Sequence, residues 1–194
     1  MKKICLVLFA LLSGIFASAQ VQLGVKAGLN LSTLSHSGSP NVNPAWKSSF
    51  NAGLLASVPI SSGFYLQPEA MYSGQGFEQW VASQSGIYEL GYLNVPVLFK
   101  YKHETGLFAE TGPQIGFLLS ANLDLGGHST SIKDDFQSTD FSWAFGLGYQ
   151  FSNTGLGIDA RYNLGLTNIA KDDSGETFKN CVFQFGLFYT LNFK

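Results

Sequence analysis

The sequence has little charge and almost no cysteine, and each shortage excludes a class of protein. Charged residues make up 12% of its 194 residues, about half of the share found in ordinary soluble domains. The formal net charge of −2 provides no basic surface for nucleic acid. The cysteines are Cys5, in an apolar N-terminal segment, and Cys181. If the N-terminal segment is removed on export, Cys181 is the one cysteine left in the mature chain, and a fold held together by intramolecular disulfides is excluded.

Long apolar runs are also missing beyond the N-terminal segment. No later stretch approaches the roughly 18 consecutive apolar residues of a transmembrane helix. The N-terminal segment itself has Lys2 and Lys3, then the apolar run ICLVLFALLSGIF, then Ala17-Ser18-Ala19. This order is typical of a cleaved secretory signal peptide. We expect a signal peptide at residues 1–19 and one exported domain at residues 20–194.

The exported part of the sequence alternates between apolar and polar residues. In VQLGVKAGLNLS, residues 21–32, every second residue is apolar without exception. A period of two predicts a strand with two different faces, and no helical period competes with it. The eight segments with this pattern are 21–32, 50–58, 64–73, 93–101, 107–120, 141–151, 156–166 and 181–193.

The connections between these segments differ in length in a regular way. Three are tight turns, at 61–63, 103–105 and 152–154. Four are long and polar, at 33–47, 74–86, 122–137 and 168–179. Short turns at one end and long loops at the other predict an up-and-down antiparallel meander whose first strand closes against its last.

The composition indicates which face of the strands points outward. A soluble barrel would need many charges on its polar face, but here that face holds few charges and many of the 22 glycines. Such a face suits the crowded interior of a narrow barrel. Aromatic residues lie near both ends of the apolar face, as in the girdles of outer-membrane barrels. The predicted fold is all-β: an eight-stranded antiparallel up-and-down transmembrane β-barrel of the outer-membrane type.

Four prolines lie within the expected strands: Pro59, Pro68, Pro96 and Pro113. Proline cannot donate a hydrogen bond to a neighbouring strand. We therefore expect β-bulges or local bends at these positions.

Six charged residues share the inward face of the expected strands. They are Lys26, Glu69, Lys100, Glu110, Asp159 and Arg161. An unpaired charge in a water-poor lumen costs several kcal/mol, so the balance of three bases and three acids predicts an ion-pair network that plugs the barrel. Glu69 is expected to pair with Lys26 or Arg161, and Lys100 and Glu110 to be diagonal neighbours. In the alternative interpretation, the same charges line an ion path or gate.

Support for catalysis is weak. His128, Asp124, Asp134, Asp135 and Asp140 could converge at the outer rim, but they match no known arrangement around a nucleophile. A solvated polar loop is the preferred interpretation. The acidic segment KDDSGE, residues 171–176, lacks the spacing of a calcium loop. We predict no enzyme activity, no catalytic residue, no cofactor and no metal site.

Several stretches resemble a known family. LGVKAGLNLS, FYLQPEAMYSGQG, YLNVPVLFKY and the closing aromatic strand are similar to the PorT-like small outer-membrane β-barrels of Gram-negative bacteria. The resemblance implies a place in the cell outer membrane, among outer-membrane lipid and lipopolysaccharide. It also implies insertion by the barrel-assembly machinery and a link to protein export.

The leading hypothesis for function is a small non-catalytic outer-membrane barrel with a structural or interaction role. It would have a plugged, charged lumen and long extracellular loops that can bind a protein partner. Three alternatives stay open: a component of a protein secretion or assembly system, a narrow ion channel, and a rim-located membrane enzyme.

Overall fold

The computed structural model describes residues 21–37, 44–81, 84–152, 154–171 and 176–191. The expected signal peptide, residues 1–19, and most of the acidic segment 171–176 lie outside these residues. In the part of the chain that is described, no helix is long and apolar enough to cross a membrane.

Eight long strands make up nearly all of the described structure. They are β1 (Gln22–Ser37), β2 (Ala45–Ser61), β3 (Phe64–Val81), β4 (Gln84–Lys102), β5 (Leu107–Leu125), β7 (Thr139–Gln150), β8 (Leu156–Gly165) and β9 (Thr177–Leu191). Between β5 and β7 lie the short strand β6 (His128–Ser131) and the 3-10 helix η1 (Lys133–Asp135).

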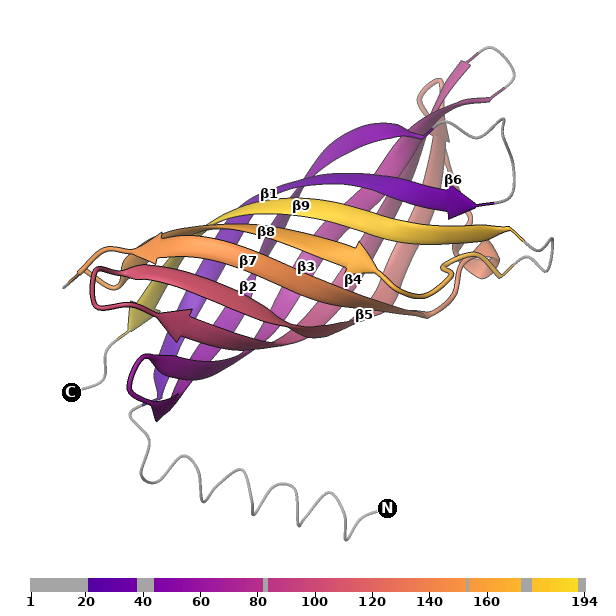
Figure 1. The fold of residues 1–194 in the computed structure, drawn as a ribbon. Helices are drawn as coiled ribbons and strands as arrows, with labels where there is room; N and C mark the ends of the chain where they lie inside the picture. Colours follow the sequence, from indigo (N-terminus) through magenta and orange to yellow (C-terminus); the bar gives the residue numbers. More distant parts are fainter. Residues whose placement is uncertain (1–20, 38–43, 82–83, 153, 172–175, 192–194) are drawn as a thin grey trace, which may run out of the picture.

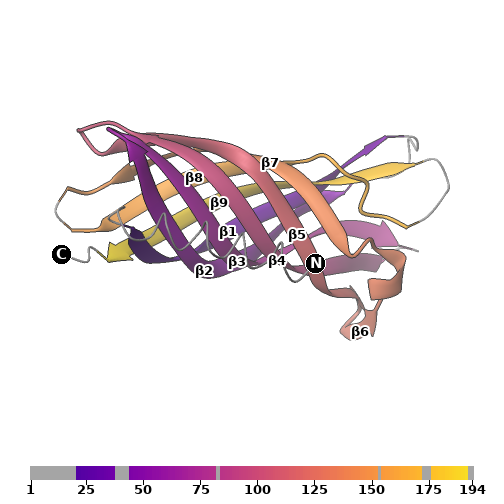
Figure 2. The ribbon, with the colours of Figure 1, turned by 90° about the horizontal axis from the view of Figure 1, so that it is seen from below.

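The eight long strands form a closed ring. Their order is β4-β3-β2-β1-β9-β8-β7-β5. The ring closes because β4 also pairs with β5, and the short strand β6 pairs with β5 as well. Every pairing is antiparallel. Figures 1 and 2 show the tilted strands wrapping around a long barrel. The predicted eight-stranded meander, closed between its first and last strands, is confirmed.

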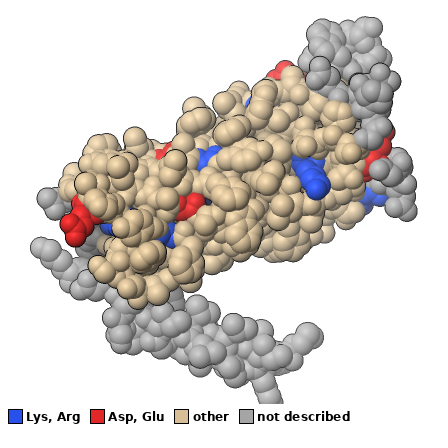
Figure 3. All heavy atoms as spheres, viewed as in Figure 1, with Lys and Arg blue, Asp and Glu red and all other residues tan. Residues whose placement is uncertain are grey.

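The two faces of the barrel have the polarity of a membrane protein. Large apolar side chains point outward, and Leu147 is 67% exposed. Charged side chains point inward, and Arg161 is only 3% exposed. On the face shown in Figure 3, most atoms belong to uncharged residues, and the Asp and Glu atoms lie mostly towards the ends. The outer surface is therefore suited to contact with lipid chains.

All four expected long loops are partly strand: β1 extends to Ser37, β2 begins at Ala45 and β9 begins at Thr177, and the other two loops depart further from the expectation. Residues 74–86 were expected to form a loop, but β3 and β4 pair from Gly74 opposite Gly91 to Val81 opposite Gln84. The rings of Phe77 and Tyr88 stack there with centroids 4.3 Å apart, which stabilises this polar hairpin. The expected loop 122–137 contains the end of β5, as well as β6 and η1.

The expectation of four proline bulges is also largely wrong. The register between β2 and β3 shifts at Pro59. At Pro68, Pro96 and Pro113 the strand register is the same on both sides. These three positions interrupt individual pairings but add no residue to either strand, so a proline here does not require a bulge.

Candidate functional site

The inward side chains fill the lumen in successive layers. An apolar group formed by Leu55, Phe108 and Phe188 lies towards the short turns. The charge network of Lys26, Glu69, Lys100, Glu110, Asp159 and Arg161 comes next, and a layer of amides and hydroxyls follows. The outer mouth is closed by an apolar cap.

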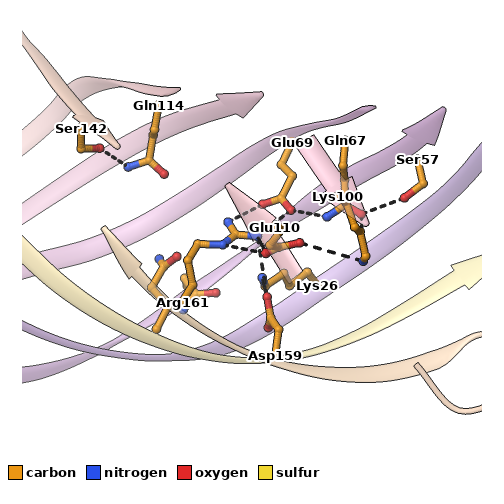
Figure 4. A network of polar contacts seen from close by, with 12 residues as sticks. Lys26, Ser57, Gln67, Glu69, Lys100, Glu110, Gln114, Ser142, Asp159 and Arg161 are labelled. Atoms are coloured by element: carbon orange, nitrogen blue, oxygen red, sulfur yellow. Dashed lines mark hydrogen bonds and ion pairs between the residues drawn. The ribbon is translucent and has the colours of Figure 1, made fainter. Parts of the chain in front are cut away.

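Arg161 is the centre of the charge network (Figure 4). Its Nη1 and Nη2 donate to Oε2 and Oε1 of Glu69, each over 2.9 Å. Its Nη2 and Nε also donate to Oε1 of Glu110, over 2.6 and 3.1 Å. One guanidinium on β8 therefore joins carboxylates on β3 and β5. A planar guanidinium suits this arrangement because it offers five donors in a fixed fork.

The two lysines complete the network. Lys26 forms an ion pair with Asp159, whose Oδ2 is 3.7 Å from Nη2 of Arg161. Lys100 Nζ lies 4.0 Å from Oε2 of Glu110 and 3.6 Å from the centre of the Phe108 ring. Lys100 and Glu110 are direct cross-strand partners, so the expectation of diagonal neighbours was wrong. The structure places all six candidate residues in one buried group, each less than a tenth exposed.

Glycines give the network its space. A Cβ atom on Gly146 would lie 2.8 Å from Cγ of Glu110, and one on Gly186 would lie 2.6 Å from Cε of Lys26. Both distances are too short for real contacts, so the long charged side chains occupy volume that only glycine leaves free. This explains why inward positions of β7 and β9 carry glycine beside the charges.

Asn30 organises the layer of amides above the network. Its Oδ1 accepts hydrogen bonds from Nδ2 of Asn51 and Nε2 of Gln184, over 2.6 and 3.1 Å. Its Nδ2 donates to Oγ of Ser73 over 3.0 Å and to the carbonyl of Gly74 over 2.7 Å. The side chain thereby links β1, β2, β3 and β9 across the lumen.

The apolar cap closes the outer half of the lumen. It consists of Leu34, Phe77, Leu90, Tyr92, Leu118, Ala121 and Ile169, all buried. Ile169 comes from the connection between β8 and β9 and is 0% exposed. Sequence reasoning missed this cap because it treated residues 168–179 as a solvated polar loop. Ile169, an isoleucine within that polar stretch, was the sequence feature that could have indicated the cap.

The turn end is closed by polar contacts as well as by Phe108 and Phe188. Lys102 Nζ donates to Oε1 of Gln150 over 3.1 Å. Gln150 Nε2 in turn donates to Oγ1 of Thr190 over 2.9 Å. These contacts join β4, β7 and β9 just inside the short turns.

The candidate rim residues do not form a catalytic group. His128, Asp134 and Asp135 are exposed and Asp124 is half-buried, whereas Asp140 is buried inside the barrel. Asp124 accepts a hydrogen bond from the backbone of Gly127 over 2.9 Å, as expected in a tight turn. Within the described residues, no hydrogen bond or ion pair joins His128 to these aspartates, and no group of three His, Cys, Asp or Glu residues could hold a metal ion.

Comparisons with known proteins agree with this architecture. The family described as outer membrane protein beta-barrel domain matches residues 16–171. Among solved structures, Neisserial surface protein A is similar with a TM-score of 0.54 and 15% identity, over 88% of this chain and 97% of that chain. The outer membrane protein OprG from Pseudomonas aeruginosa is similar with a TM-score of 0.51 and 10% identity, over 90% and 98%. A comparison with curated proteins finds no match.

Proposed function

The chain belongs to the outer membrane protein beta-barrel domain family, and from that premise we propose that it is a closed, non-catalytic barrel with a structural or interaction role. The observation that carries the proposal is the filled lumen. The apolar group at the turn end, the charge network and the apolar cap follow one another along the axis. An eight-stranded barrel is just wide enough for its own side chains, so this filling leaves the loops as the surface for partners.

The location proposed for the protein follows from the same features. Residues 1–19 would direct export and be removed, and the barrel-assembly machinery would insert residues 20–194 into the outer membrane. The exposed apolar belt would contact outer-membrane lipid, and the outer ends of the strands would lie among lipopolysaccharide. A protein partner would bind at the long outer ends of the barrel.

A second candidate function is a component of a protein secretion or assembly system. The PorT-like resemblance of the strand motifs supports it, as does the extended β3–β4 hairpin, which provides an ordered surface beyond the shorter strands β7 and β8. Cross-linking in intact cells, followed by purification from solubilised membranes, tests it. A stoichiometric partner would favour this candidate over a purely structural role.

We expect purified protein in planar lipid bilayers to give no steady ion conductance. We expect the filled lumen to leave ions no continuous water path, because the buried cap lies on one side of the charge network and the Phe108–Phe188 contact, with ring centroids 5.9 Å apart, on the other. A larger porin in the same bilayers serves as a positive control. Regular single-channel steps from this protein would contradict the closed barrel and favour the ion-path alternative.

We also expect the protein to fractionate with outer membranes and to migrate differently on detergent gels before and after boiling. A closed ring leaves no unpaired strand edge, so the folded form resists detergent until it is heated. Fractionation followed by paired boiled and unboiled samples provides the measurement. Recovery of folded protein from the soluble periplasmic fraction would contradict the outward apolar face.

A further inference from the structure

A cavity with polar walls lies at the short-turn end of the barrel, and we call it the turn-end cavity. Its volume is about 530 Å³, within the range of about 300–1,000 Å³ that is usual for small-molecule sites. A water molecule in the liquid occupies only about 30 Å³, so the cavity has room for an organic ligand. All three short turns contribute to its walls, through Ser62, Gly63, His103, Gly106, Ser152 and Gly155.

A row of hydrogen-bonded side chains forms the floor of the turn-end cavity. Lys102 and Gln150 line the cavity, and Nζ of Lys102 donates to Oε1 of Gln150 over 3.1 Å. Gln150 donates in turn to Thr190, whose Oγ1 donates to the carbonyl of Gly155 over 3.2 Å. The cavity is therefore closed towards the charge network, as in a binding site and unlike in a channel.

Lys102 brings to this floor a positive charge that no acid balances. Its side chain is half-buried, and its Nζ lies 5.1 Å from the centre of the Tyr65 ring. Among the described residues it forms no ion pair, not even with Glu104, which is exposed and also lines the cavity. The charge network is balanced within itself. Asp140, the remaining buried acid of the described chain, is ten residues from Gln150 along β7, or about 33 Å.

The charge and the walls of the cavity indicate the chemistry of a ligand. A single lysine balances one negative charge, which is the charge of a carboxylate, whereas a phosphate monoester carries about −1.5 to −2 near neutral pH. A hydrogen bond between an ammonium group and a carboxylate is roughly twice as strong as one between neutral groups. The amide of Gln22 and the hydroxyls of Ser62 and Ser152 line the same cavity, so the rest of the ligand can also be polar.

We propose that the turn-end cavity binds a small organic carboxylate, either a free acid or the free carboxyl end of a peptide, and that Lys102 pairs with the carboxylate. Gln150 and the Tyr65 ring hold the ammonium group of Lys102 at the floor of the cavity. The binding site is outside the charge network, so the lumen stays closed when the ligand binds. In the orientation proposed above, the cavity opens towards the periplasm.

The test titrates mature protein, refolded in detergent with isotope-labelled glycine, and follows the amide signals by NMR. N-acetyltriglycine ends in a carboxylate, N-acetyltriglycinamide has the same backbone without the charge, and acetate is the carboxylate group with a single methyl. N-acetyltriglycine should shift the signals of Gly63, Gly106 and Gly155, which line the cavity, and leave Gly127, between β5 and β6, unchanged. The neutral amide should bind at least about tenfold more weakly.

The third probe distinguishes the two sources of the carboxylate. Acetate that binds as tightly as N-acetyltriglycine would support a small free acid as the ligand. Tighter binding of N-acetyltriglycine would support the end of a peptide. Because the protein is in detergent, neither result depends on the location of the barrel in the cell or on its conductance.

Substitutions test the role of Lys102. Lys102→Met removes the charge and should weaken the binding of N-acetyltriglycine by about tenfold or more, whereas Lys102→Arg keeps the charge and should retain binding. Lys133→Met, on η1 at the opposite end of the barrel, is the matched control and should bind like the native protein. Equal binding of N-acetyltriglycine and its amide to the native protein, or no shift at the three turn glycines, would overturn the proposal. So would unchanged binding in folded Lys102→Met.

Discussion

Replacing Arg161 with methionine is expected to lower the free energy of unfolding by about 3–5 kcal/mol, the usual cost of removing one side of a buried ion pair. The guanidinium donates four hydrogen bonds to Glu69 and Glu110. Without it, Glu69 keeps Gln67 Nε2 as a donor, at 2.8 Å, but loses its basic partner. Urea unfolding in lipid vesicles, followed by tryptophan fluorescence, measures the change.

A double variant separates charge from packing. Glu69→Gln together with Arg161→Met leaves Lys26 with Asp159 and Lys100 with Glu110, so the remaining charges balance. We expect the double variant to regain part of the stability that Arg161→Met loses. Lys133→Met, at an exposed position, controls for loss of a cation and should change stability by less than about 0.5 kcal/mol. If Arg161→Met costs less than about 1 kcal/mol, as exposed pairs do, water solvates the network and the plug is contradicted.

Replacing Leu147 with arginine is expected to cost about 2–4 kcal/mol or to block insertion, because an arginine at the bilayer midplane must be removed from water. Leu147 points outward and is 67% exposed. It lies opposite Ala160, in the middle of β8, and opposite Ala109 on β5, two residues further from the short turns than Leu107. Equilibrium folding into vesicles measures the cost.

The matched control is the same substitution near the membrane surface. Leu107 also points outward and is 60% exposed, but it is the first residue of β5, beside the short turns. Leu107→Arg should cost only about 0–1 kcal/mol, because its charge can reach the interface. Equal costs at the two positions would mean that the apolar belt is not centred on Leu147.

Strand direction and face could be predicted from the sequence because each depends on local alternation. Residues 21–32 alternate without error, and a one-residue slip would put every side chain on the wrong face. Strand length was harder to predict. Residues 74–86 contain the glycine and glutamine typical of loops, yet they continue the β3–β4 pairing, because the partner strand and the Phe77–Tyr88 stack outweigh weak strand propensity.

The candidate site was only partly predictable, for a geometric reason. Alternation places Lys26 and Asp159 on the inward face, but they are 133 residues apart, and their pairing depends on how the closed ring aligns β1 with β8. The alternation pattern therefore left two possible partners for Glu69 and could not decide between them. Asp140 was assigned to a rim group, although its even spacing from Ser142 and Ala144 is the signal that it points inward.

The distribution of the charge network along the chain has a consequence for assembly. Strands β1 to β5 contribute Lys26, Glu69, Lys100 and Glu110, two positive and two negative side chains. Strand β8 contributes Asp159 and Arg161, one of each sign. The network groups on the N-terminal strands are therefore neutral as a set before β8 joins them, and those on β8 are neutral when it arrives. The network can therefore enter the membrane as two groups of residues, each with no net charge. Arg161 connects the two groups only when the ring closes.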